Sequence, residues 1–427
     1  MTEAFLPNFT ESRALLERAR SVIPMATQTW SKHASQWPDR VAPSFIQSGK
    51  GAHVWDVDGN EWLDYAMALA PVILGYAEPA VNAAVRRQLE EGVVFSLSHP
   101  IEVQVAEQIV RMVPGVEAVR FGKSGSDVVS AAVRAARNLT GRDQLLVCGW
   151  HGWHDWYVAS AGFSAGVPTA VRDLVSKFAY NDLDSLEQQL ERGNGRIAAV
   201  ALEPSGTELP TPGFLEGVVE RAHAHGALVI FDEVVTGFRL APGGARERYG
   251  VQPDFSCYGK ALGNGMPVSA VAGRWDVMRS FDEVFVSLTH GGETLSLAAA
   301  SVVLDMIADG SILARIERLG TRLLHGFNER IAAHGVGHLV RASGEPHRPV
   351  VTFPGDTDQL RRSWVHQCFA QHGILFNGST PLCARHTDAD IDAGLVALDH
   401  ALEVMARCDD LAPMLVGAPM RPVFRSR

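Results

Sequence analysis

Cysteine is scarce in this chain of 427 residues, and basic residues form no dense cluster. The five cysteines are an odd number and include no Cys-x-x-Cys pair, which argues against a disulfide framework or a zinc ribbon and fits a reducing compartment. Lys and Arg total 38 against 48 Asp and Glu, so the net charge is −10. Because nucleic-acid binding needs basic patches that release counterions, no nucleic-acid partner is expected.

Long hydrophobic runs are missing as well. The longest uncharged apolar stretch, 65–77, contains Pro71 and Gly75 and is well short of the ~20 residues that cross a bilayer. The first residues carry neither the basic region nor the apolar core of a secretory signal. We therefore expect no membrane association and a cytoplasmic location. Hydrophobic residues still make up 46% of the chain, which is enough for a real core.

The middle of the chain alternates short apolar runs with helical stretches. The runs 145–148, 197–202 and 227–231 are apolar throughout, and a helical stretch, 215–225, precedes the last of them. Continuous apolar runs of this kind are typical of buried parallel strands joined by helical crossovers. They predict an α/β domain that binds its ligand at the carboxyl ends of the strands.

The two ends of the chain have a different pattern. Asp58-Gly59 is a strong turn signal, so 53–64 is expected to form a hairpin. Thr387 followed by acidic residues predicts the start of a last helix. A smaller α+β domain, with which the hairpin packs, is predicted from these features together with helices at 11–22 and 312–333 and strands at 350–353 and 374–376.

Two loops at predicted strand ends offer contacts for a flat anionic ligand. In Gly122–Asp127, Gly125 allows close backbone approach, Ser126 adds a hydroxyl, and the following helix offers free N–H groups to an anion. A plain helix cap is the alternative, and the segment matches neither nucleotide-binding glycine motif. The aromatic loop 149–157 suits either stacking on a ligand or simple packing. His151 and His154 have no third ligand near them, so no metal site is expected.

An acid and a lysine follow at two later strand ends. Asp232 ends a very apolar strand, so it is either exposed there or paired with a buried cation. Lys260 lies among apolar and glycine residues, where burial would favour the free amine that Schiff-base chemistry requires; a solvated lysine is the alternative. An anion cradle, a stacking aromatic, an acid and a lysine are the parts that a pyridoxal phosphate site needs.

The motifs Asp232-Glu233-Val234-Val235-Thr236-Gly237-Phe238-Arg239 and Gly259-Lys260-Ala261 form a highly specific pair. With them, the chain resembles the class III (subgroup II) aminotransferases of fold type I, in the branch of glutamate-1-semialdehyde aminomutase. The resemblance implies an α/β fold with a mostly parallel central sheet in a large domain, 66–310. It also implies a small α+β domain formed by the N-terminal segment 1–65 and the C-terminal segment 311–427.

The resemblance assigns roles around the cofactor, pyridoxal 5′-phosphate. Lys260 would hold the cofactor aldehyde as a Schiff base, and Asp232 would pair with the ring nitrogen. Val234 would pack on one face of the ring, and Trp150, which stands where the family usually has Tyr or Phe, would stack on the other. Glu203 matches a Glu-Pro pair near the cofactor.

The resemblance also assigns the phosphate and the assembly. Gly125 and Ser126 would bind the phosphate, while Thr289 would reach the phosphate of the neighbouring subunit. A homodimer with active sites at its interface is therefore expected. The Thr289 match is looser, since the family's Gly-Asn-Pro reads Gly292-Glu293-Thr294 here.

The implied activity is transfer of an amino group from an amino-acid donor, expected to be glutamate, to a carbonyl acceptor. Glu208 falls where the family's gate for dicarboxylate donors has a Glu, but Arg385 is no clear partner for it, and we favour solvent for that side chain. Residues 28–33 replace an Arg-containing stretch of the true aminomutases, which favours a sugar-like or ulosonic-acid acceptor. A 2,1-aminomutase and a non-catalytic cofactor-binding regulatory module are the alternatives.

Overall fold

The computed structural model describes residues 7–421, which divide into two compact units. Unit 1 combines the N-terminal segment up to Glu78 with the C-terminal segment from Ala314, and unit 2 is Pro79–Leu313. The resemblance put the corresponding boundaries at 65 and 310. The start of the chain, residues 1–6, where no signal motif was found, lies outside the described residues.

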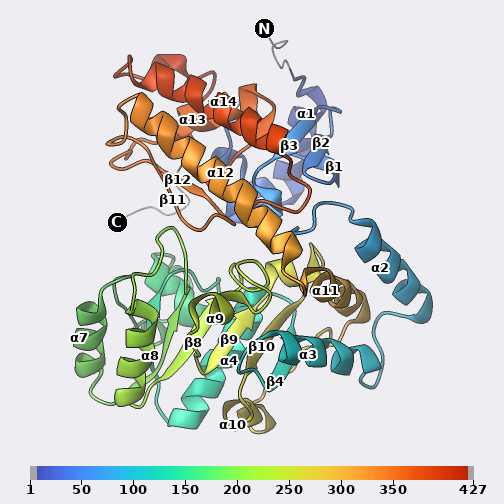
Figure 1. Ribbon diagram of the computed structural model, residues 1–427, viewed down its shortest axis with the longest axis vertical. Coiled ribbons are helices and arrows are strands. Elements are labelled where there is room, and N and C mark those ends of the chain that lie inside the picture. The colour runs from blue at the N-terminus through green and yellow to red at the C-terminus, as the bar shows by residue number, and fades with distance from the viewer. Residues whose placement is uncertain (1–6, 422–427) are drawn as a thin grey trace. The chain divides into compact units, whose positions relative to one another are not determined.

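Unit 2 is built on a seven-stranded sheet with the order β4-β10-β9-β8-β7-β5-β6 (Figure 1). The predicted strands are confirmed as β5, β7 and β8, which run parallel to one another, whereas β10 is antiparallel to both of its neighbours. The strands are β4 (Ala118–Gly122), β5 (Gln144–Cys148), β6 (Val175–Lys177), β7 (Ile197–Leu202), β8 (Leu228–Glu233), β9 (Phe255–Tyr258) and β10 (Ser269–Gly273).

Helices cover both faces of this sheet. Alternate residues of a strand point to opposite faces, so a strand that is apolar throughout must be covered on both sides. In β7 all six residues are buried. Ala199 and Ala201 pack in one core with α4, while Val200 and Leu202 pack in another with α7 and α8. The helices of unit 2 are α2 (Pro79–Glu91), α3 (Pro100–Met112), α4 (Gly125–Thr140), α5 (Asp155–Val158), α6 (Thr169–Arg172), α7 (Leu183–Gly193), α8 (Phe214–Ala224), α9 (Gly244–Tyr249), α10 (Trp275–Met278) and α11 (Thr294–Ile307).

The topology brings several strand ends to one edge of the sheet. Strands β4 and β9 are both antiparallel to β10, so they run in the same direction as each other. Strands β9, β8, β7, β5 and β6 are parallel in turn. The loops after β4, β5, β7, β8 and β9 therefore leave from the same edge, which is where an α/β sheet binds ligands.

Unit 1 contains a smaller sheet, in the order β1-β2-β3-β13. The predicted hairpin is confirmed as β2 and β3, and β13, from the C-terminal segment, pairs in parallel with β3. Trp62 is fully buried, and its indole donates a hydrogen bond to the Asp56 carboxylate (3.0 Å). The strands of this sheet are β1 (Ile46–Lys50), β2 (His53–Asp56), β3 (Glu61–Asp64) and β13 (Ile374–Leu375), while β11 (Arg341–Ser343) and β12 (Val350–Thr352) form a separate two-stranded sheet.

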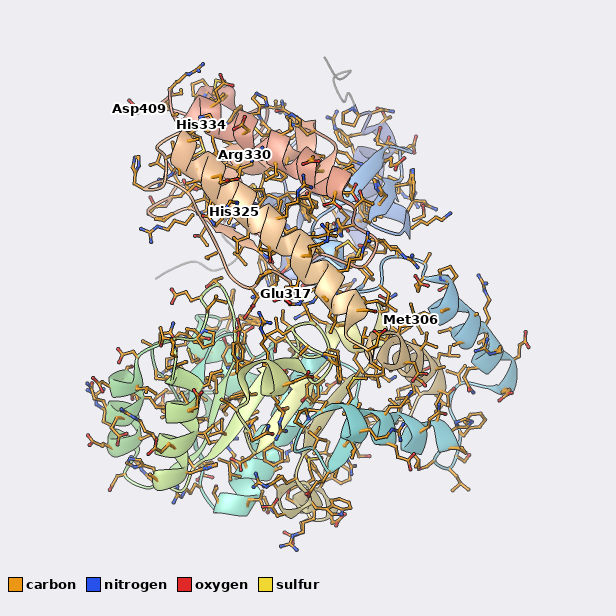
Figure 2. The ribbon with its side chains drawn as sticks, in the orientation of Figure 1. Met306, Glu317, His325, Arg330, His334 and Asp409 are labelled. Carbon is orange, nitrogen blue, oxygen red and sulfur yellow. The ribbon has the colours of Figure 1, made fainter. Side chains whose placement is uncertain are left out.

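Three of the four helices of unit 1 agree with the sequence patterns, whereas α13 (Leu360–Gln371) was not predicted. Figure 2 shows Glu317, His325 and Arg330 spaced along the longest of them, α12. Thr387 caps the last helix, and Asp390 completes a reciprocal capping box. These helices are α1 (Thr10–Val22), α12 (Ser311–Ala333), α13 (Leu360–Gln371) and α14 (Asp388–Met405).

No single helix within residues 7–421 is long and apolar enough to cross a membrane. The same residues contain no group of three or more His, Cys, Asp or Glu side chains placed to hold a metal ion.

Candidate active site

Asp232 is buried at the carboxyl end of β8 and is paired with a histidine. Its Oδ2 lies 2.9 Å from Nδ1 of the fully buried His151, and its Oδ1 accepts the Val234 N–H (3.1 Å). Opposite an ionised carboxylate, which can only accept, the His151 Nδ1 is the donor. The acid is therefore not exposed at the strand end; of the two alternatives the sequence left open, the buried pair is the one found.

The β4–α4 turn provides a cradle of backbone N–H groups. Ser124 caps α4, and Asp127 closes a capping box by accepting the Ser124 N–H (2.7 Å). Ser126 is buried in the first turn of the helix. Gly152, with φ of 90°, lies against it so closely that a Cβ there would overlap the Ser126 Oγ. Only glycine fits at this position without displacing Ser126.

Val234 packs against two glycines of the motifs that the sequence analysis singled out. A Cβ on Gly125 would be 2.8 Å from the Val234 Cγ2, and one on Gly259 would be 3.4 Å from the Val234 Cγ1. The first of these distances is too short for any side chain, so glycine at 125 lets the start of α4 approach β8. Figure 1 shows β8 and β9 side by side, with α4 packed beside them.

Lys260 directly follows this contact. It begins a 3-10 helix, Lys260–Gly263, with a φ of 40°, which side-chain-bearing residues rarely adopt. Ala261 and Leu262 are fully buried and hold the turn in place. Strained backbone that the surrounding packing maintains is a common feature of functional sites.

The aromatic loop after β5 is anchored at several points. The Trp150 N–H donates to Oε2 of Glu203, which follows β7 (2.8 Å), and the Tyr157 hydroxyl donates to the Gly149 carbonyl (2.7 Å). The Trp150 indole is 41% exposed and meets the Tyr157 ring edge-on. Glu203 thus fixes the backbone of the aromatic residue predicted to stack on the cofactor.

Both histidines of that loop have partners other than a metal. His151 binds Asp232, and the His154 Nδ1 lies 2.7 Å from the Ser130 Oγ, which also accepts the Trp156 indole N–H (2.8 Å). His151 is the site residue that the sequence analysis missed as a partner of the acid. Its position directly after Trp150 was the available signal, but sequence spacing did not show that it faces Asp232.

Four other predicted features have surroundings of their own. Thr289 is in an exposed turn whose Gly291 lies against Phe121 of β4. Glu208 is exposed in the loop after β7. Within unit 1, Arg385 is only half exposed and forms an ion pair with the buried Glu78 (2.5 Å), so it is not simply solvated. Residues 28–33 in the same unit include a short 3-10 helix, Trp30–Lys32.

The cluster fits pyridoxal phosphate. Gly125 and Gly152 let Val234 and Ser126 pack closely around the N-terminus of α4, where a phosphate gains free N–H groups and a favourable dipole. Asp232 is a buried acid held by hydrogen bonds, as a ring-nitrogen partner must be. A lysine and a half-exposed indole complete the set that this cofactor requires.

Comparison with known proteins identifies the class. The family described as "Aminotransferase class-III" matches residues 34–389. The glutamate-1-semialdehyde 2,1-aminomutase of Roseiflexus castenholzii is 39% identical over 428 residues, covering 92% of this chain and 96% of that enzyme. The chain therefore belongs to the class-III aminotransferases.

Two solved structures extend the comparison to the fold. The pyridoxal-phosphate form of the FumI protein of Sphingopyxis sp. MTA144 covers 95% of this chain and 100% of its own, with a TM-score of 0.86 and 29% identity. An omega-transaminase from Sphaerobacter thermophilus covers 94% and 99%, with a TM-score of 0.86 and 28% identity. The protein is a pyridoxal-phosphate-dependent enzyme of fold type I, as the resemblance implied.

Proposed function

We propose that Lys260, Asp232 and their neighbours form the active site of an amino-group transfer enzyme. Bound pyridoxal phosphate supplies the electron sink for this chemistry. Lys260 would attach the cofactor, and its amine, once released, would move the proton at the substrate carbon. Asp232, oriented by the His151 N–H and the Val234 N–H, would stay anionic opposite the ring nitrogen.

The remaining residues would bind and orient the cofactor. Gly125 and Ser126, at the start of α4, would hold the phosphate. Val234 and Trp150 would contact the two faces of the ring, and Glu203 would keep Trp150 in place through its backbone N–H. The partners are a small-molecule amino donor and carbonyl acceptor, which are two parts of one molecule in an aminomutase.

We propose a 2,1-aminomutase acting on glutamate-1-semialdehyde or a close analogue as the reaction. The observation that carries this proposal is the match to glutamate-1-semialdehyde 2,1-aminomutase over 92% of the chain. None of the relatives reported above is named for a sugar, so the sugar-like acceptor has no support from them. A cofactor-binding regulatory module has none either.

An intermolecular transaminase is the second candidate. The similarity to the omega-transaminase favours it, as does the replacement of the aminomutase's Arg-containing stretch by residues 28–33. One incubation separates the two reactions. The enzyme is given glutamate-1-semialdehyde labelled with ¹⁵N at its amino group, and no other carbonyl compound.

An aminomutase converts this substrate completely to the product with the labelled amino group on C1. A transaminase has only the aldehyde of the substrate itself as acceptor, so it yields one dicarbonyl and one diamine product from two substrate molecules, or stops after one turnover per site until a separate acceptor is added. The first result supports the aminomutase proposal, and the second contradicts it. Cytoplasmic location stays a prediction.

We further propose a homodimer. Segment 288–292, which carries Thr289, borders a groove of unit 2 that neither Asp232 nor Lys260 lines. Apolar side chains contribute much of its wall, among them Val103, Phe121, Trp275 and Phe281. Contact with a second subunit there would cover the exposed Trp275 and bring Thr289 to the partner.

A further inference from the structure

An ion pair joins the predicted phosphate-binding turn to the start of another helix. The Lys123 Nζ lies 2.8 Å from the Glu293 Oε2, and the two side chains are only 20% and 11% exposed. Lys123 stands between the end of β4 and Ser124, the cap of α4. Glu293 is the cap of α11. A pair so well shielded is screened much less by salt than a surface pair.

Glu293 is fixed in its orientation by α11. Its carboxylate accepts the Leu295 N–H (2.6 Å) and the Ser296 hydroxyl (2.5 Å) in addition to Lys123. Burial tends to raise the pKa of Glu293, but the hydrogen bonds and charge of Lys123 and the bond from Ser296 outweigh it and leave that pKa below its ordinary value. Glu293 is therefore charged at neutral pH, and the start of α11 fixes the position of the carboxylate that binds Lys123.

The pair accounts for a departure in the sequence. Glu293 and Thr294 occupy the positions where the resembled family has Asn and Pro in Gly-Asn-Pro. A neutral Asn would leave the ammonium of Lys123 without a counter-charge. Thr294 donates its hydroxyl to the Gly92 carbonyl (2.9 Å), a bond that Pro cannot make. The departure thus preserves a capped α11 and adds a charge facing the phosphate-binding turn.

We infer that Lys123 and Glu293 form a positioning pair for the cofactor phosphate; this inference rests on the proposed function. Asp127, in the first turn of α4, stabilises the turn by accepting the Ser124 N–H (2.7 Å). Glu293, at the start of α11, stabilises it through the ion pair with Lys123. Gly125 and Ser126 follow directly, so a displacement of the turn moves the N–H groups that receive the phosphate. Replacing either Lys123 or Glu293 removes the ion pair that joins the turn to α11.

The test compares pyridoxal phosphate with pyridoxal, which lacks the phosphate. Each is titrated, by visible absorbance, into cofactor-stripped wild-type enzyme and its Glu293→Gln and Lys123→Met variants. Because removing one member of a shielded pair leaves the other uncompensated, both variants should raise the Kd for pyridoxal phosphate by about tenfold. The Kd for pyridoxal should not change, since it does not use the turn. Lys123→Arg should restore most of the affinity.

A matched control removes an ion pair elsewhere in unit 2. Glu187→Gln disrupts the contacts of Glu187 with Arg221 and His225, which join α7 to α8. It should change neither Kd. Thermal unfolding of each variant shows whether the fold is intact, and a variant that does not fold is replaced by Lys123→Gln or Glu293→Asn.

Other outcomes overturn the inference. If Glu293→Gln tightens binding of pyridoxal phosphate while Lys123→Met weakens it, Lys123 acts directly on the phosphate and Glu293 only competes for it. If both Kd values rise together, the pair is merely structural, and equal affinities in all variants exclude any role. Failure of wild type to bind either aldehyde covalently would contradict the proposed function itself, which separates that result from failure of the pair.

Discussion

His151 and Asp232 show what limits prediction at the scale of single residues. The sequence marks Asp232 as important because a carboxylate seldom ends an apolar strand without a partner. It does not name the partner, which is 81 positions away and comes from a loop after a different strand. Only the order of strands in the sheet brings the two side chains within hydrogen-bond distance.

Replacing His151 tests the importance of this contact. His151→Leu removes the ring N–H that the Asp232 carboxylate accepts and puts no donor in its place. Because a hydrogen bond to a charged group contributes about 1.5–3 kcal/mol, cofactor retention should fall by about tenfold to a hundredfold. The measurement is the cofactor absorbance that remains after exhaustive dialysis. His154→Leu, in the same loop but bonded to Ser130, is the control and should retain more. Equal retention by both variants would show that His151 does not act through Asp232.

Glu233, next to Asp232, makes a prediction about pH. It is fully buried, and burial raises its pKa from 4.5 to about 7, although the Ala245 N–H and the charge of Arg246 oppose the shift. Since the folded-state pKa lies above the unfolded one, this contribution to stability is complete below about pH 4.5. It is lost as the pH rises through about 7, by about 3 kcal/mol in total.

Glu233→Gln should therefore be progressively more stabilising, relative to wild type, as the pH rises from 4.5 to 8. Urea unfolding at a series of pH values measures the difference, with Glu187→Gln, at a partly exposed ion pair, as the control. The amide keeps an oxygen that can accept the Ala245 N–H (2.5 Å in wild type). A stability difference that does not change with pH would mean that Glu233 ionises normally in the folded enzyme.

At the scale of elements, the strands that were predicted differ in a clear way from those that were not. Strands β5, β7 and β8 are continuous apolar runs between turn signals, so their burial on both faces could be inferred. Strand β10, Ser269–Gly273, is made of small residues that favour no element strongly. Its place between β4 and β9 depends on pairing with both neighbours, which local sequence does not encode.

The contact of α4 with the aromatic loop gives a prediction at this scale. Gly152→Ala places a methyl group on the Ser126 Oγ and forces alanine into a positive φ of 90°. Both effects displace the first turn of α4, so affinity for pyridoxal phosphate should fall by about tenfold or more. Gly162→Ala has a similar φ, 94°, but meets nothing within 4 Å. It should strain the backbone locally and leave cofactor binding unchanged; equal losses in both variants would refute steric displacement of Ser126.

For the whole molecule, the sequence motifs were sufficient for the class and not for the reaction. The motifs around Asp232 and Lys260 identified the cofactor and the fold, and the family match agrees with both. The motifs did not identify the acceptor. The expectation of a sugar-like acceptor depended on residues 28–33, which form no motif that specifies a substrate. The named relatives favour the aminomutase alternative. Substrate choice depends on side-chain placement that no linear pattern specifies.

Assembly gives a prediction at the same scale. If Thr289 reaches the phosphate of the other subunit, Thr289→Ala should remain a dimer and lose cofactor faster than wild type. Analytical ultracentrifugation gives the oligomeric state, and dialysis gives the cofactor loss. A neighbouring exposed position, Ser287→Ala, is the control. A wild-type monomer with full cofactor occupancy would remove the basis for the role of Thr289.

The central claim is that Lys260 carries pyridoxal phosphate opposite Asp232. Its most direct test is borohydride reduction of the purified enzyme, followed by digestion and mass spectrometry of the peptides. We predict a single cofactor-modified peptide containing Lys260, and no modification after reduction of Lys260→Ala, which should fold but lack the visible band of the lysine-bound cofactor. Modification of another lysine, or wild-type turnover by Lys260→Ala, would contradict the account.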